Sequence, residues 1–158
     1  MPTPSPTSSP RLVAAQDNAG DPRYSVMFPA PVARRLAHPK DAQGAALAAT
    51  SAKAATGAEY DVFDLSPATL TPGKEIQGLT YEAKKFYSNF ACAVATRSAP
   101  AIKGEPTIAF SGTCGGRKVL GFVVDRHAHM YFVDVEAASQ KALPMDASAF
   151  LASFSLKS

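Results

Sequence analysis

Residues 107–136 read TIAFSGTCGGRKVLGFVVDRHAHMYFVDVE, and this stretch decides the fold. Apolar residues alternate with others over Lys118–Arg126, a period typical of a strand with one buried face. His129–Glu136 is apolar at most positions, which predicts a central strand covered on both faces. With a further strand over Thr107–Ser111, the stretch predicts three consecutive strands, joined by a glycine-rich turn and by the turn Asp125–Ala128.

The residues before this stretch add further strands. Tyr24–Phe28 alternates and ends at a proline, and Ala58–Leu65 alternates after the dipeptide Thr-Gly. Because Gly57 accepts a positive φ without a Cβ clash, this dipeptide predicts a hairpin whose first arm is Ala45–Ala55. The segment Ala33–Gly44 shows no clear period, and we expect it to form a loop.

Two helices are expected. An apolar stripe at i, i+4 and i+8 predicts a long helix that starts at Lys74 or Thr80 and ends near Arg97. The stripe consists of Phe86, Phe90 and Val94. A short helix over Asp146–Ser153 would have Asp146 as its N-cap. Strands grouped as hairpins, with helices between and after them, indicate an α+β fold in which helices pack on an antiparallel sheet.

This order of elements resembles the PsbP-like α/β/α sandwich superfamily over Tyr24–Leu156. The matching stretches are YSVMFPAPV at 24–32, EYDVFDLSP at 59–67, residues 107–135, and FLASFSL at 150–156. The resemblance implies an α/β/α sandwich and a tendency toward binding roles, as in the exported bacterial proteins and lipoproteins of the superfamily. It implies no shared catalytic motif and no site residues.

The chain of 158 residues divides into two parts. Residues 1–22 are rich in Pro, Ser and Thr and lack an apolar stripe that would offset the entropy of ordering, so we predict a disordered leader. Residues 23–158 form one α+β domain, long enough to bury a core. No apolar run approaches the roughly 20 residues of a membrane helix. The net charge is +3 with scattered basic residues, apart from Arg34, Arg35 and Lys40, which disfavours a nucleic-acid partner.

Cys92 and Cys114 are the two cysteines. An even pair favours a disulfide in an exported domain, here between the long helix and the loop after the next strand, although a buried free thiol at Cys92 is the alternative. No charged segment followed by an apolar one opens the chain, so either the protein is cytoplasmic or a signal or lipid-anchor segment has been removed. We favour a periplasmic or extracellular location, with membrane contact only through such a removed anchor.

Two groups of residues have chemical interpretations. Cys114 lies beside glycines and near Arg117, which would favour a thiolate, but no histidine is specified as its base. Two histidines at i and i+2 of an extended chain, His127 and His129, point the same way and could bind a metal near Asp125, but a third ligand would have to come from elsewhere.

The glycine cluster at 112–118 lacks the spacing of a phosphate-binding loop, and a strand follows it where a helix would be needed, so it predicts a turn. We therefore predict no catalytic residue, no metal site and no cofactor. The predicted function is a non-catalytic binding or accessory module of the bacterial cell envelope, which holds a protein partner or a small ligand.

Two alternatives remain open. One is a small Cys- or metal-dependent enzyme, built on Cys114 or on His127 and His129. The other is a cytoplasmic chaperone or adaptor on the same fold, which predicts two free thiols.

Overall fold

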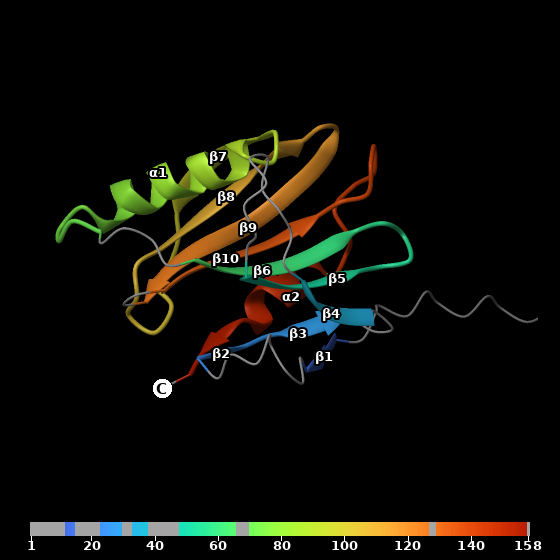
Figure 1. The fold of residues 1–158 in the computed structure, drawn as a ribbon, viewed down its shortest axis with the longest axis horizontal. Coiled ribbons are helices and arrows are strands. Elements are labelled where there is room, and N and C mark those ends of the chain that lie inside the picture. Colours follow the sequence, from blue (N-terminus) through green and yellow to red (C-terminus); the bar gives the residue numbers. More distant parts are fainter. Residues whose placement is uncertain are drawn as a thin grey trace, which may run out of the picture.

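A computed structural model describes residues 12–14, 23–29, 33–37, 48–65, 70–126 and 129–157. Its main element is a seven-stranded antiparallel sheet with the strand order β4-β5-β6-β10-β9-β8-β7 (Figure 1). These strands are β4 (Ala33–Ala37), β5 (Ala48–Lys53), β6 (Glu59–Leu65), β7 (Cys92–Ser98), β8 (Thr107–Cys114), β9 (Arg117–Arg126) and β10 (His129–Glu136).

Four short strands and two helices complete the described elements. The short strands are β1 (Leu12–Ala14), β2 (Tyr24–Ser25), β3 (Met27–Pro29) and β11 (Ser155–Leu156), and they pair as β1 with β3 and β2 with β11. The helices are α1 (Glu75–Ser88) and α2 (Ala147–Ser153). No helix in the described ranges is long and apolar enough to cross a membrane.

The strands follow the predicted periodicity. The three strands within 107–136 are confirmed as β8, β9 and β10, and β10 has neighbours on both sides in the sheet. The hairpin between β5 and β6 is also confirmed, with Gly57 at a φ of +97° in its turn. Along β10 successive side chains point to opposite faces, and residues 130–135 are all buried because both faces are covered.

The two faces of the sheet have different coverings. One apolar cluster lies on the face that β2, β3, α2 and β11 cover, and it includes Tyr24, Tyr60 and Phe150. The other lies beneath α1, which crosses β7, β8 and β9, and it includes Phe86 and Phe132. In Figure 1 these layers lie above and below the sheet.

The prediction of an α/β/α sandwich with helices packed on the sheet is wrong: the protein has a β-rich fold. Among the described residues there are two helices, of 14 and 7 residues, beside eleven strands. On the face opposite α1 the covering layer consists largely of extended chain, because the prolines and the alternating residues near Tyr24–Pro29 favour strand over helix.

The long helix is shorter than predicted. It ends at Ser88, the chain turns through Ala91 at a φ of +59°, and the predicted last turns of the helix are instead strand β7. Val94 shares an apolar cluster with Phe86 and Phe90, but it reaches that cluster from β7. The i, i+4, i+8 spacing therefore joined residues of two different elements.

Two other segments differ from expectation. Ala33–Ala37, predicted as part of a loop, forms edge strand β4, while 38–44 lies outside the described residues. Strand β1 lies within the predicted disordered leader and pairs with β3, and the rest of residues 1–22 is also outside the described residues. The short helix begins one residue after Asp146 as predicted, but Asp146 makes no side-chain capping hydrogen bond.

Candidate functional site

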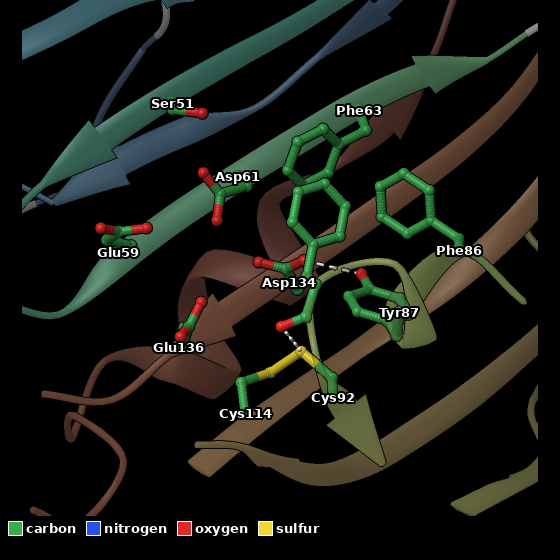
Figure 2. A pocket seen from close by; sticks show the side chains of 11 residues that line it. Ser51, Glu59, Asp61, Phe63, Phe86, Tyr87, Cys92, Cys114, Asp134 and Glu136 are labelled. Atoms are coloured by element: carbon green, nitrogen blue, oxygen red, sulfur yellow. Dashed lines mark hydrogen bonds between the residues drawn. A yellow bond between two sulfur atoms is a disulfide. The ribbon is translucent and has the colours of Figure 1, made fainter. Parts of the chain in front are cut away.

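A pocket of about 240 Å³ opens at the C-terminal end of α1, between that helix and the sheet (Figure 2). Its described lining residues come from β5, β6, β7, β8 and β10, the last turn of α1 and the segment between α1 and β7. They are Ser51, Glu59, Asp61, Phe63, Phe86, Tyr87, Phe90, Cys92, Cys114, Asp134 and Glu136. In Figure 2 the carboxyl groups gather on one side and the rings of Phe63 and Phe86 on the other.

The carboxyl groups meet because of strand register. Strands β6 and β10 pair so that Asp61 lies opposite Asp134, and Glu59 lies opposite Glu136. Side chains two residues apart on a strand share a face, so all four carboxyl groups lie on the α1 face of the sheet. The alternate residues of both strands face the other way, into the apolar cluster.

Asp134 is the most enclosed of these acids, with 3% of its surface exposed. The Tyr87 hydroxyl donates a hydrogen bond of 2.6 Å to Asp134 Oδ2, and Asp134 Oδ1 is also buried. Burial, followed by the charge of Asp61 and a hydrogen bond with the Asp61 side chain, raises the pKa of Asp134 well above its usual range. Burial and the nearby Asp134 also raise the pKa of Tyr87, which keeps this hydroxyl a donor.

Arg117 lies at the rim of the carboxyl group cluster. Its Nη1 is 3.3 Å from Glu136 Oε1 and 3.9 Å from Glu59 Oε1. Two backbone carbonyls orient the guanidinium: Nε donates to Ala137 O at 2.8 Å, and Nη2 donates to Gly57 O at 3.0 Å. Burial raises the pKa of Glu136, although Arg117 opposes this shift. The positive charge of the guanidinium therefore offsets part of the repulsion between the carboxylates of Glu59 and Glu136.

Three phenylalanine rings form the apolar wall. The ring centroids of Phe63 and Phe86 are 5.1 Å apart, and those of Phe86 and Phe90 are 5.2 Å apart. The angles between the ring planes are 62° and 58°, so the rings pack edge-to-face or tilted, which is a favourable geometry for aromatic rings. The pocket thus combines acidic groups with an aromatic surface.

The predicted disulfide between Cys92 and Cys114 is present. It joins the paired strands β7 and β8 at directly opposed positions, where the sequence predicted a link between helix and loop. There is no free cysteine in the described part of the chain, so the thiol that a Cys114 nucleophile requires is taken up by this bond.

The structure describes only part of the predicted histidine site, namely His129 and Asp125. His129 Nδ1 lies 2.9 Å from Asp64 Oδ1, and Arg23 contacts both Asp64 and the other ring nitrogen of His129. Asp125 lies on β9 opposite Met130, and His127 is outside the described residues. The described residues contain no group of three His, Cys, Asp or Glu side chains arranged to hold a metal ion.

The glycine cluster forms the predicted turn. Gly115 and Gly116 have φ values of +57° and +85° between β8 and β9. Neither lines the pocket beneath α1. This cluster therefore forms the turn of the β8–β9 hairpin.

Sequence reasoning missed the four acids of the pocket. Their signal is the placement of acids at alternate positions in EYDVF and FVDVE, which puts each pair on one face of its strand. What joins the two pairs is the register between strands about 70 residues apart, and the pattern of either strand alone does not specify it.

No family model matches the chain, and no curated protein matches it. The resemblance to the PsbP-like superfamily therefore stays a prediction. The candidate site rests on the geometry of the described residues.

Proposed function

We propose that this chain is a non-catalytic binding module that holds a small ligand in the pocket beneath α1. One observation carries the proposal: a pocket of about 240 Å³ beneath α1 brings the buried Asp134, whose Oδ2 accepts a hydrogen bond from Tyr87, together with three further acids and three phenylalanine rings. A cavity of this composition offers a small ligand both an apolar surface and oriented polar groups.

The surroundings of Asp134 support this proposal. Most small-ligand sites are concave and largely apolar, with a few polar groups that fix orientation. Here the rings of Phe63, Phe86 and Phe90 supply the apolar surface, and acids supply the polar groups. Acids with raised pKa values in a cleft are also typical of functional sites.

The disulfide supports the compartment we propose. Disulfides persist in oxidising surroundings such as the periplasm and the extracellular space, and they are rare in the cytosol. Since Cys92 and Cys114 are bonded, we place the module in such a compartment, as an accessory protein of a cell envelope. An adaptor with two free thiols would require both cysteines reduced.

The test is a fragment screen of the oxidised full chain by protein-observed NMR. Expected hits perturb the amide signals of Phe63, Phe86 and Asp134 together, and binding saturates. The Ser51→Phe variant places a ring in the pocket from β5 and should abolish these hits, provided that its unfolding midpoint shows that it is folded. Hits that persist unchanged in this variant, or a screen with no perturbation at the pocket, would contradict the proposal.

A further inference from the structure

We infer that the Cys92–Cys114 disulfide is a redox latch of the pocket: its reduction releases Phe90 from the pocket wall and weakens ligand binding. This inference rests on the proposed binding function and names a regulation of the same site. It follows from three features of the structure: the position of the bond, a strained turn beside it, and the access that solvent has to one of its sulfur atoms.

The disulfide belongs to the pocket wall. Both cysteines line the pocket, and Cys92 follows shortly after the lining residue Phe90 (Figure 2). The bond joins the first residue of β7 to the last residue of β8, because Cys92 and Cys114 lie opposite each other in the register. In the described part of the chain β7 is an edge strand with β8 as its neighbour, so the disulfide anchors the start of this edge covalently.

The turn that joins α1 to β7, residues 89–91, is strained and fixed at both ends. Ala91 has a φ of +59°, a left-handed conformation that costs a residue with a Cβ atom free energy and persists where the surrounding structure holds it. On the α1 side, backbone N–H groups of the turn donate to carbonyls of the last helical turn. On the β7 side, the disulfide holds the chain. Cleavage of the covalent end therefore allows Ala91 to relax.

Phe90 is the wall residue that depends on this turn. Its side chain is half-buried, and its ring centroid lies 5.2 Å from that of Phe86 and 6.2 Å from that of Phe63. Phe86 is held independently, because it belongs to α1 and its ring centroid lies 4.4 Å from that of Phe132 on β10. Reduction should therefore remove Phe90 from the wall and leave α1 in place on the sheet.

The reductant is a dithiol that reaches the bond through Cys92. This residue is half-buried, whereas Cys114 is 8% exposed. One thiolate of the dithiol attacks Cys92 Sγ, the S–S bond breaks, and Cys114 leaves as a thiolate that takes up a proton. The second thiol group then attacks the mixed disulfide, so that the reductant closes to a cyclic disulfide and Cys92 leaves and is protonated in turn. The dithiol thus loses two electrons and two protons, and the protein gains both pairs.

The experiment compares the oxidised full chain with the same chain in excess dithiothreitol, where mass spectrometry after alkylation shows complete reduction. We expect the nuclear Overhauser effects between the rings of Phe90 and Phe63 to disappear on reduction, and those between Phe86 and Phe132 to persist. Fragments that perturb the pocket in the NMR screen are then titrated into both forms. If the form with an intact wall falls to about one tenth of the population, their apparent affinity falls about tenfold. Reoxidation should restore both signals.

Two variants sharpen the assignment. The double variant Cys92→Ala and Cys114→Ala should show the reduced pattern at all times and should not respond to dithiothreitol, which controls for other effects of the reagent. Phe90→Ala removes the same wall residue from the oxidised chain, so it should weaken fragment binding by a similar factor. Reduction of Phe90→Ala should then add little, because both changes act through one side chain. The comparison of redox forms of the unmodified chain needs no variant to fold.

The outcomes separate this inference from the proposed function. If the Phe90–Phe63 signals persist after complete reduction, or if the Phe86–Phe132 signals disappear with them, the bond does not act on the turn and the latch is wrong. If the signals change as expected but fragments bind both redox forms equally, the regulation is wrong and the binding function stands. If no fragment binds either form, the proposed function fails, whereas loss of the Phe90–Phe63 signals alone would still support the latch.

Discussion

Two tyrosine–aspartate pairs lie on opposite faces of the same sheet. On the α1 face, Tyr87 donates to Asp134 at 2.6 Å; on the other face, Tyr60 donates to Asp146 at 2.7 Å. Both tyrosines and both aspartates are buried, and in each pair the hydroxyl donates to one oxygen of the aspartate. The two pairs therefore start from the same local chemistry.

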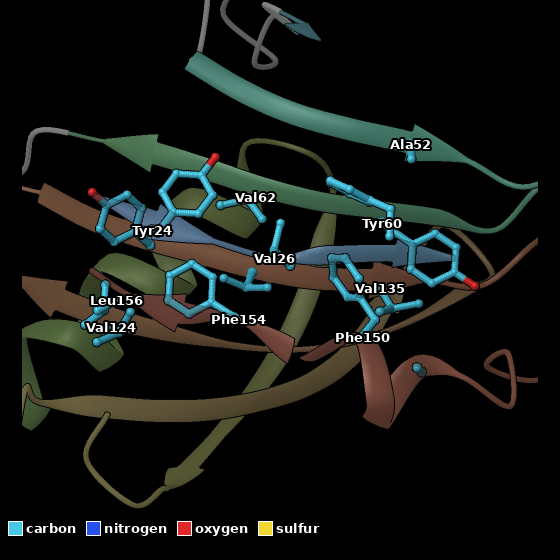
Figure 3. Packing of buried hydrophobic residues seen from close by; sticks show 14 of the residues in the cluster. Tyr24, Val26, Ala52, Tyr60, Val62, Val124, Val135, Phe150, Phe154 and Leu156 are labelled. Atoms are coloured by element: carbon cyan, nitrogen blue, oxygen red, sulfur yellow. The ribbon is translucent and has the colours of Figure 1, made fainter. Parts of the chain in front are cut away.

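Their surroundings differ. Tyr60 packs edge-on against Phe150 at 5.2 Å, in a cluster that fills the space beneath α2 (Figure 3), so its pair joins the start of α2 to the sheet. Asp134 lines a pocket together with three other acids, whereas Asp146 is not among the residues that line it. The comparison shows that a buried tyrosine–aspartate pair becomes part of a candidate site only where a cavity lies beside it.

Removal of one phenylalanine from each face should have the largest effect on the free energy of unfolding. Phe150→Ala is expected to cost about 3–5 kcal/mol in the free energy of unfolding, because a fully buried ring leaves a cavity among Phe28 and Tyr60. Phe86→Ala should cost roughly 1 kcal/mol less, since the new space merges with an existing pocket. Urea unfolding followed by circular dichroism measures both, and equal costs would indicate that the pocket is closed in solution.

Loss of the disulfide should have the next largest effect on the free energy of unfolding. Replacement of Cys92 and Cys114 by alanine should cost about 3 kcal/mol, because the bond closes a chain separation of 22 residues and restricts the unfolded state. A reducing agent should lower the unfolding midpoint of the unmodified chain and leave that of the double variant unchanged. If reduction has no effect on the unmodified chain, the bond does not stabilise the fold.

The two hydroxyl groups can then be removed one at a time. Tyr60→Phe and Tyr87→Phe each leave an aspartate oxygen without its donor, at a cost of about 1–3 kcal/mol. We expect the smaller cost for Tyr87→Phe, because water in the adjacent pocket can take the place of the lost donor. Chemical denaturation at one pH compares the two, and a larger cost for Tyr87→Phe would contradict an accessible pocket.

The same contrast explains what could be predicted from the sequence. Periodicity identified β8, β9 and β10, because the alternation of buried residues in a strand is a local property. The pairing of Cys92 with Cys114 was predictable because no other cysteine is available. The strand inference needs only neighbouring residues, and the disulfide inference needs only the number of cysteines.

The failures involve distant residues. Helix α1 was extended into β7 because Val94 falls at a helical spacing from Phe90, although the chain reverses between them at Ala91. The acid cluster was missed because Asp61 and Asp134 meet only through the register of β6 and β10. A strand pattern specifies which side chains share a face, but not which strand lies beside it.

Counted per pH unit, the smallest expected effect is the pH dependence of stability that Asp134 causes. Its folded-state pKa is raised, so the folded chain binds more protons than the unfolded chain once the pH exceeds about 4, the usual range of an aspartate. The free energy of unfolding should therefore fall as the pH rises from about 4 toward the raised pKa, by at most about 1.4 kcal/mol per pH unit. Asp134→Asn should remove most of this fall, so its stability relative to the unmodified chain should increase with pH.

Urea unfolding of both proteins at constant ionic strength, from pH 4 to pH 8, measures this difference. Glu136, whose pKa is also raised by burial, should leave a residual fall in Asp134→Asn, and Glu136→Gln on the same background should reduce it further. Parallel curves for the unmodified chain and Asp134→Asn would show that Asp134 is not held neutral. The Tyr60–Asp146 pair would keep its structural role in either case.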